Sequence, residues 1–274
     1  MTRAAVLGAL ALAGCSAPLP PPRADALPRI ASTNPCSDAI LAEVTAPGQL
    51  VAVSRYSRDP SQSSMDVALA RRLAVADGTE TVAAARPDLV IGSPFDGAAA
   101  RGAYARMGIA YEGVGIAATV ADSIAQVRRL ASLAHQPARG EALVARIEAA
   151  VAAPTPPPVT AIVWQGGGLV AGDGTLVADL MRRSGFANAV AARGLGQGSV
   201  LGLERLVADP PQVIFVAGGA RGRGWALGDR MLAHPVLAHL RGTRRIALDP
   251  ALLWCGGPTI PRLAEALRAA RSSL

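Results

Sequence analysis

The sequence contains no lysine and few aromatic, histidine or cysteine residues. All 27 basic residues of the 274-residue chain are arginine, which excludes both a P-loop, whose motif needs lysine, and Schiff-base chemistry. Three Phe, three Trp and three Tyr are too few for a protein that stacks single-stranded nucleic acid on aromatic rings. Three His and three Cys are too few for a rich metal site, so we expect no resident metal and no cofactor.

Apolar residues and positive charge are abundant. Hydrophobic residues make up 51% of the sequence, which is enough for one large core or two modest ones. Charged residues make up only 17%, which is too few for a disordered polyelectrolyte. The net charge of +7 is spread along the chain and not gathered in a run, so we expect no nucleic-acid partner.

Residues 1–14 have the pattern of a bacterial lipoprotein signal peptide. Arg3 precedes an apolar stretch that is too short to span a bilayer, and Leu-Ala-Gly stands directly before Cys15. This ending resembles a lipobox, in which the cysteine thiol receives the lipid and becomes the new N-terminus. The alternative is an ordinary secretory peptide with a chance cysteine. We expect a periplasmic protein that is held at the cell envelope by lipid on Cys15.

Residues 15–28 are rich in proline and favour an extended tether over a helix or a central strand. Beyond them, short apolar runs alternate with stretches rich in alanine, leucine and arginine. This alternation predicts an α/β fold with parallel sheets. The predicted strands cover residues 30–32, 50–54, 88–92, 108–111, 160–164, 213–217 and 245–248.

Between the predicted strands lies a long helical stretch. Apolar positions recur at helical spacing over residues 119–157, and Pro137 marks a kink or a helix start within them. We therefore expect an N-terminal α/β lobe over residues 29–118, one long bridging helix over 119–157 and a C-terminal α/β lobe over 158–274. Both lobes would be Rossmann-like, with the ligand cleft between them.

One segment of the first lobe has a counterpart in the second. The segment that starts at Gly78 and the segment that starts at Gly202 each place a glutamate two residues later, Glu80 and Glu204. Each continues through a proline into an apolar strand. The repeat favours two equivalent lobes, although any α/β protein contains helix–turn–strand units.

The order of these elements resembles the helical-backbone substrate-binding proteins of ABC importers, which include cobalamin- and ferric-siderophore-binding proteins. The resemblance runs from about Pro28 to Leu274. Its motifs are Arg29–Pro35, Val51–Ser57, Glu80 with Arg86–Ile91, Glu204 with Pro210–Ile214, and His234–Leu237 with Arg244–Asp249. It implies a monomer without enzymatic activity that delivers a metal chelate, a corrinoid or a ferric siderophore, to a permease and its ATPase subunit. It also implies that Glu80 and Glu204 dock on arginines of the permease.

The ligand in such a fold lies against the loops that leave the strand ends. The candidate cleft residues in these loops are Asn34, Cys36, Tyr56, Phe95, Gln165, Arg221, Arg223, Trp225, Trp254 and Cys255. Aromatic rings would cover a planar ligand, and arginines would meet an anionic one. For Cys36 and Cys255 we expect free thiols, then contact with the cargo; a disulfide needs Cα atoms within ~7 Å.

Two other classes of protein fit parts of the pattern. Gly-rich stretches after strands are compatible with a periplasmic α/β enzyme that acts on a phosphate-bearing small molecule, although no complete nucleotide or nucleophile motif is present. The other class is an envelope lipoprotein that kept the fold and lost transport. The paired glutamates argue against this third class.

Overall fold

The first lobe is built on a five-stranded parallel sheet. The computed structural model describes residues 27–60, 62–152, 157–218 and 234–274. The sheet order is β3-β2-β1-β4-β5, so the first strand lies at its centre. The strands are β1 (Ile30–Ser32), β2 (Leu50–Val53), β3 (Ala74–Val75), β4 (Leu89–Gly92) and β5 (Ala110–Gly113). All residues of β1 and β4 are buried, as continuous apolar runs of this kind predict.

The helices of this lobe begin at recognisable caps. Asn34 caps α1 (Pro35–Val44) by accepting a hydrogen bond from the Cys36 N–H, and Pro35 occupies the first turn, where its missing N–H has no cost. Asp66 caps α2 (Val67–Arg72), because its side chain accepts a hydrogen bond from the Leu69 N–H. The remaining helices are α3 (Thr79–Ala84) and α4 (Ala98–Arg106).

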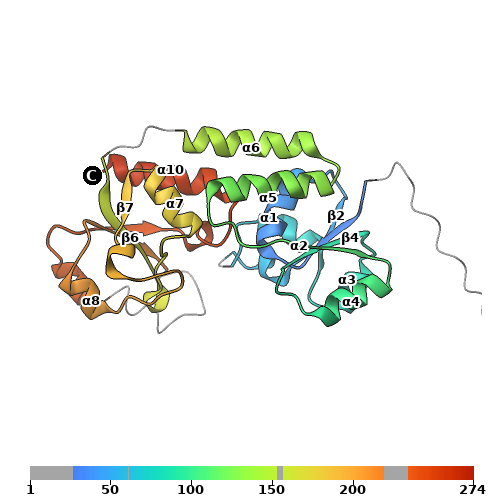
Figure 1. The fold of residues 1–274 in the computed structure, drawn as a ribbon, viewed down its shortest axis with the longest axis horizontal. Helices are drawn as coiled ribbons and strands as arrows, with labels where there is room; N and C mark the ends of the chain where they lie inside the picture. The colour runs from blue at the N-terminus through green and yellow to red at the C-terminus, as the bar shows by residue number, and fades with distance from the viewer. Residues whose placement is uncertain (1–26, 61, 153–156, 219–233) are drawn as a thin grey trace, which may run out of the picture.

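The second lobe repeats this plan with four parallel strands. The sheet order is β7-β6-β8-β9, again with the first strand of the lobe inside the sheet. The strands are β6 (Val159–Gln165), β7 (Phe186–Asn188), β8 (Val213–Ala217) and β9 (Arg244–Leu248). The α-helices within the described part of this lobe are α7 (Leu176–Arg183), α8 (Leu203–Ala208) and α10 (Thr259–Ser272). The two α/β lobes with parallel sheets confirm the predicted fold class (Figure 1).

The bridge differs from the expected single helix over 119–157. It consists of two helices, α5 (Val120–Leu133) and α6 (Pro137–Val151), which pack side by side and both run along the two lobes (Figure 1). The chain reverses over residues 134–136, where His135 has a φ of 55°, and Pro137 starts the second helix. Close packing needs Gly140, since a Cβ there would lie 2.4 Å from the Ala131 Cβ.

One hydrophobic core continues through both lobes. Ile30 and Ile91 of the first lobe, Leu130 of the bridge, and Val163 and Phe215 of the second lobe belong to the same cluster of buried side chains. The lobes are therefore joined by packing on the bridge and not only by the chain. No helix among the described residues has the length and apolar character needed to cross a membrane.

Candidate functional site

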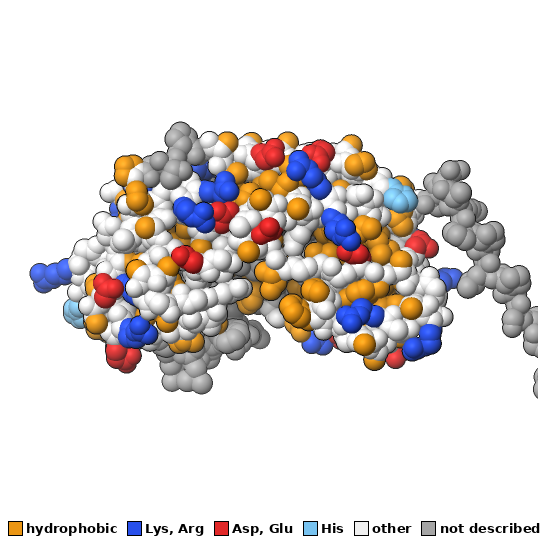
Figure 2. Space-filling view, in the orientation of Figure 1, with side chains coloured by type: hydrophobic (Ala, Val, Ile, Leu, Met, Phe, Trp, Pro, Cys, Tyr) orange, Lys and Arg blue, Asp and Glu red, His pale blue; other side chains and the backbone are white. Residues whose placement is uncertain are grey.

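The C-terminal ends of the two sheets meet at a hollow between the lobes. Cys36 follows β1 and Cys255 follows β9, and their Cα atoms are 5.0 Å apart. In a parallel sheet all strands end at the same edge, so the loops that follow the other strands also lie near this point. Figure 2 shows the hollow between the lobes on the lower edge of the molecule, with hydrophobic side chains beside it.

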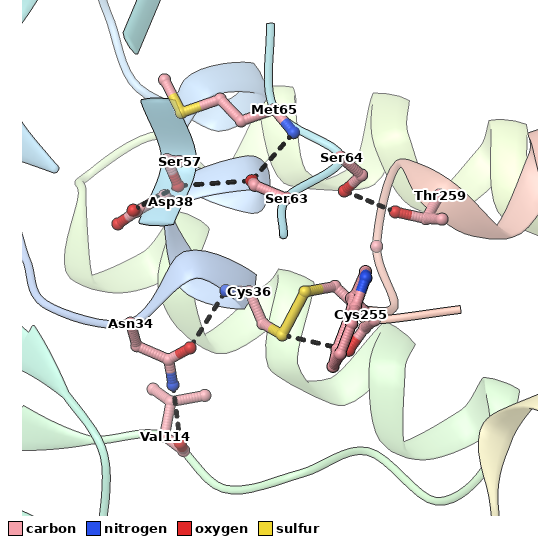
Figure 3. Close-up of a disulfide and its surroundings, with 12 residues drawn as sticks. Asn34, Cys36, Asp38, Ser57, Ser63, Ser64, Met65, Val114, Cys255 and Thr259 are labelled. Carbon is pink, nitrogen blue, oxygen red and sulfur yellow. Dashed lines mark hydrogen bonds between the residues drawn. A yellow bond between two sulfur atoms is a disulfide. The ribbon is translucent and has the colours of Figure 1, made fainter. Parts of the chain in front are cut away.

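Cys36 and Cys255 form a disulfide, which corrects the expectation of free thiols (Figure 3). Asn34 positions Cys36, because its Oδ1 accepts from the Cys36 N–H at 3.0 Å while its Nδ2 donates to the Val114 carbonyl at 3.3 Å. The sequence could not reveal the pair, since 219 residues separate the two cysteines. The same contacts show that the Asn34 side chain caps a helix and ties it to the segment that crosses between the lobes.

Large apolar side chains are exposed at the strand ends. Phe95 is 83% exposed after β4, Trp254 is 51% exposed beside Cys255, and Tyr56 is 40% exposed after β2. Ile116, which follows β5 and was not singled out from the sequence, is 76% exposed. Its position just beyond a strand was the signal that could have identified it. Exposed apolar groups at one edge of two facing sheets are typical of a site for a large apolar ligand.

A cavity of about 300 Å³ lies at the strand ends of the first lobe. Arg55 and Tyr56 on one side and Asp77 to Thr79 on another line part of its wall. The Arg55 guanidinium donates to Asp77 at 3.0 Å and to the Tyr56 hydroxyl at 3.0 Å, and it also lies 4.9 Å from the centre of the Tyr56 ring. These contacts hold the Tyr56 phenol in place at the mouth of the cleft.

Asp38 is a buried carboxyl close to this region, and no pattern in the sequence predicted its role. It lies in α1, and its Oδ2 accepts hydrogen bonds from the Ser54 N–H at 2.8 Å and from the Ser57 hydroxyl at 2.7 Å. Its Oδ1 has no hydrogen-bond partner within the described structure. Burial raises the pKa of Asp38 to about 7, and the nearby donors at Ser32, Ser57 and Ser54 partly oppose this.

The remaining predicted cleft residues fall in two groups. Gln165 ends β6, and its side chain is half-buried while its backbone N–H donates to the Leu169 carbonyl. Arg221, Arg223 and Trp225 lie outside the described residues, as does Cys15. In the ranges that the structure describes, no three His, Cys, Asp or Glu side chains are grouped as they would be around a metal ion.

Glu80 and Glu204 occupy equivalent places in the two lobes. Each is the second residue of a six-residue helix, α3 or α8, whose N-cap is a glycine. Both side chains are exposed, and neither makes an ion pair among the described residues. Figure 1 shows α3 and α8 on the edge of the molecule opposite α6. The two carboxylates are therefore free to bind a partner that contacts both lobes.

Similar folds occur among solved periplasmic proteins. The heme-binding protein HutB of Vibrio cholerae superposes with a TM-score of 0.69 at 19% identity, over 89% of this chain and 98% of that one. A periplasmic heme-binding protein from Pseudomonas aeruginosa gives 0.67 at 24% identity, over 89% and 92%. The heme-binding protein RhuT from Roseiflexus sp. RS-1 gives 0.66 at 22% identity, over 90% and 98%. No curated protein sequence matches the chain.

Two α/β lobes on a helical bridge, with a hollow at the facing strand ends, define a solute-binding protein. A family model described as periplasmic binding protein matches residues 30–245. The chain belongs to this family, whose members deliver ligands to ABC permeases. The predicted resemblance to substrate-binding proteins of ABC importers is thereby confirmed at the level of the family.

Proposed function

We propose that the protein is a lipid-anchored periplasmic solute-binding protein that delivers a planar metal chelate to an ABC importer. The observation that carries the proposal is that exposed apolar side chains follow the C-terminal strand ends of both lobes, where the two sheets meet at the hollow. Phe95 and Ile116 on one side and Trp254 on the other offer apolar surface that water would otherwise cover. A tetrapyrrole, either a corrinoid or a haem, has two flat faces that match such an arrangement.

Tyr56 supports an iron chelate among these ligands. A phenol oxygen is a ligand that protein-bound haem iron accepts. The Arg55 guanidinium donates to this oxygen at 3.0 Å and would stabilise negative charge that forms on it when iron binds. The similar structures named above are heme-binding proteins by their descriptions, which is consistent with haem as cargo. A ferric siderophore is the second candidate, and Arg55 would meet its negative charge.

To identify the cargo, the protein is titrated separately with haemin, cobalamin, cobinamide and a ferric siderophore. Binding is monitored by Trp fluorescence and by the absorbance of the chelate. We expect tight binding of a tetrapyrrole and a shift of the haemin Soret band. Tyr56→Phe should weaken haemin binding and change this band, whereas Tyr104→Phe, at a buried tyrosine in the wall of the same cavity, should leave the band unchanged. Binding of none of the four chelates would refute the chelate proposal.

Docking on the permease would use Glu80 and Glu204. An arginine of the permease can bind each carboxylate with two hydrogen bonds, and the first-turn position places the charge at the favourable end of the helix dipole. We expect Glu80→Gln with Glu204→Gln to abolish uptake in cells while ligand binding stays normal. Glu148→Gln, which neutralises an exposed carboxylate of the bridge, is the matched control. Undiminished uptake by the double variant would refute the docking role.

The lipid anchor follows from the residues before Cys15 and has its own test. Cells fed labelled palmitate should label the wild-type protein and not Cys15→Ser, and the variant should be recovered in the soluble periplasmic fraction. Equal labelling of both proteins would refute lipidation at Cys15.

A further inference from the structure

The Cys36–Cys255 disulfide joins the two lobes directly. Cys36 lies in the first turn of α1 in the first lobe, and Cys255 lies between β9 and α10 in the second. The chain itself connects the lobes through the bridge and the segments that flank it. The disulfide is therefore a separate covalent link, placed at the cleft and not on the outer side of the bridge.

The residues around Cys255 also hold the first lobe and the bridge. The Ser64 and Thr259 hydroxyls form a hydrogen bond between the lobes at 2.8 Å (Figure 3). The Gly257 N–H donates to the Ser123 hydroxyl of α5 at 2.7 Å. Gly257 has a φ of 60°, and a Cβ there would lie 2.5 Å from Cγ1 of Ile40 in α1. Residues 254–259 thus form a contact segment that seats the second lobe on the first.

Both ends of the disulfide are fixed to rigid parts of their lobes. The first is held by the Asn34 cap, and the same Asn34 side chain binds the Val114 carbonyl in the crossing segment. The second is held by α10, whose apolar face is part of the continuous core through Ile260, Leu263 and Leu267. A link between two fixed points permits little change in their distance.

We propose that this disulfide is a covalent strap that holds the lobes at one separation, whether or not the cleft contains cargo. The consequence for transport rests on the proposed function, in which Glu80 and Glu204 dock on the permease. These two residues would keep the same spacing in the empty and the loaded protein. The permease would then dock both forms alike and would sense cargo by another contact.

The test measures the distance between the two docking helices. Ala84 and Ala208 are exposed, occupy the last positions of α3 and α8, and can carry spin labels on genetically encoded amino acids that do not react with thiols. The protein also carries Cys15→Ser, which leaves Cys36 and Cys255 as its two cysteines. Distances are measured by double electron–electron resonance, without and with haemin.

In the strapped protein we expect one narrow distance distribution that haemin does not shift. With Cys36→Ser and Cys255→Ser together, the distribution should broaden, or haemin should shift it. The matched control is Ser64→Ala, which removes the hydrogen bond to Thr259, keeps the disulfide and should retain the narrow distribution. Circular dichroism confirms that each variant is folded.

Two results would overturn the strap. One is a distribution in the double serine variant that is as narrow as in the strapped protein and as insensitive to haemin. The other is a thiol titration of the unfolded, unreduced protein that finds Cys36 and Cys255 free. Failure of haemin to bind would refute the haem proposal alone, since the width of the distribution without ligand still tests the strap.

Discussion

The first helices of the two lobes carry an aspartate at the same position, in different surroundings. Asp38 is the fourth residue of α1, which follows β1, and Asp179 is the fourth residue of α7, which follows β6. Both are buried. Asp179 pairs with Arg182 at 3.2 Å and Arg183 at 3.1 Å, and it accepts from the Val120 N–H at 2.9 Å. Asp38 accepts hydrogen bonds only from neutral groups.

This difference shows how a repeated scaffold can serve two electrostatic environments. At Asp179 two arginines compensate the buried charge, and the carboxylate holds the start of α5 through the Val120 N–H. At Asp38 the absence of a cation leaves burial as the main effect, which raises the pKa to about 7. The position in the fold therefore determines that the carboxyl is buried, and the groups around the carboxyl determine the free-energy cost of its burial.

Removal of the disulfide between the lobes should lower the free energy of unfolding more than any change at the two aspartates. In the chain-entropy model, a disulfide that closes a loop of this length stabilises the protein by about 5 kcal/mol, so Cys36→Ser with Cys255→Ser should lower the free energy of unfolding by up to this amount. Because the core is continuous, urea unfolding should remain one transition. Separate transitions for the lobes would show that the disulfide, and not the core, couples them.

The buried carboxyl of the first lobe should make stability depend on pH. Because the folded-state pKa of Asp38 is raised from 3.8 to about 7, the native state holds this proton more tightly, and stability decreases as pH rises through that range. The loss is at most about 4 kcal/mol, from about 1.4 kcal/mol per pKa unit. Urea unfolding at several pH values should show that Asp38→Asn removes this decrease. An unchanged slope in Asp38→Asn would contradict this assignment.

The carboxylate of the second lobe should behave differently. Asp179→Asn removes a charge that accepts two hydrogen bonds and also pairs with Arg182, and it should cost about 2 kcal/mol at neutral pH. Because the Arg182 side chain is 72% exposed and that of Arg183 is 42% exposed, added salt should reduce the difference from the wild type. The decrease of stability that Asp38 causes between pH 4 and 7 should persist in Asp179→Asn. Its disappearance would mean that both aspartates produce it.

The docking glutamates should have the smallest effect on stability. Glu80 and Glu204 are exposed and make no ion pair in the described ranges, so Glu80→Gln or Glu204→Gln should change the free energy of unfolding by less than about 0.5 kcal/mol. Urea unfolding measures this directly. A larger loss in one variant would indicate that its glutamate stabilises its own lobe, and the two lobes would not be equivalent.

The sequence predicted the fold well where one local pattern determines one element. Strands 30–32 and 213–217 have the predicted bounds, because a short run of apolar or small residues between turns fits a buried parallel strand. The two-helix bridge was not predicted from the sequence. Both of its helices bury an apolar stripe, and the helical spacing of apolar residues continues across the reversal of the chain at residues 134–136. Pro137 is compatible with a kink and with a new helix, and only the packing of α5 against α6 decides between them.

The cleft could be predicted only in part. Tyr56, Phe95 and Trp254 follow strands, and the topology brings their edges together. The disulfide depends on a distance in space that no spacing in the sequence contains. Asp38 is an ordinary first-turn acidic residue in the sequence, and its raised pKa arises from a burial that only the packed fold produces and that the donors at positions 32, 57 and 54 partly oppose.

The disulfide between Cys36 and Cys255 also affects how the protein withstands proteolysis. It encloses the bridge and nearly all of both sheets within a closed ring of the chain. A protease that cuts the backbone once anywhere between the two cysteines opens this ring but does not divide the molecule. A singly nicked protein would therefore migrate as one band on a gel without reductant and as two bands after reduction, and in the envelope it would persist as one molecule.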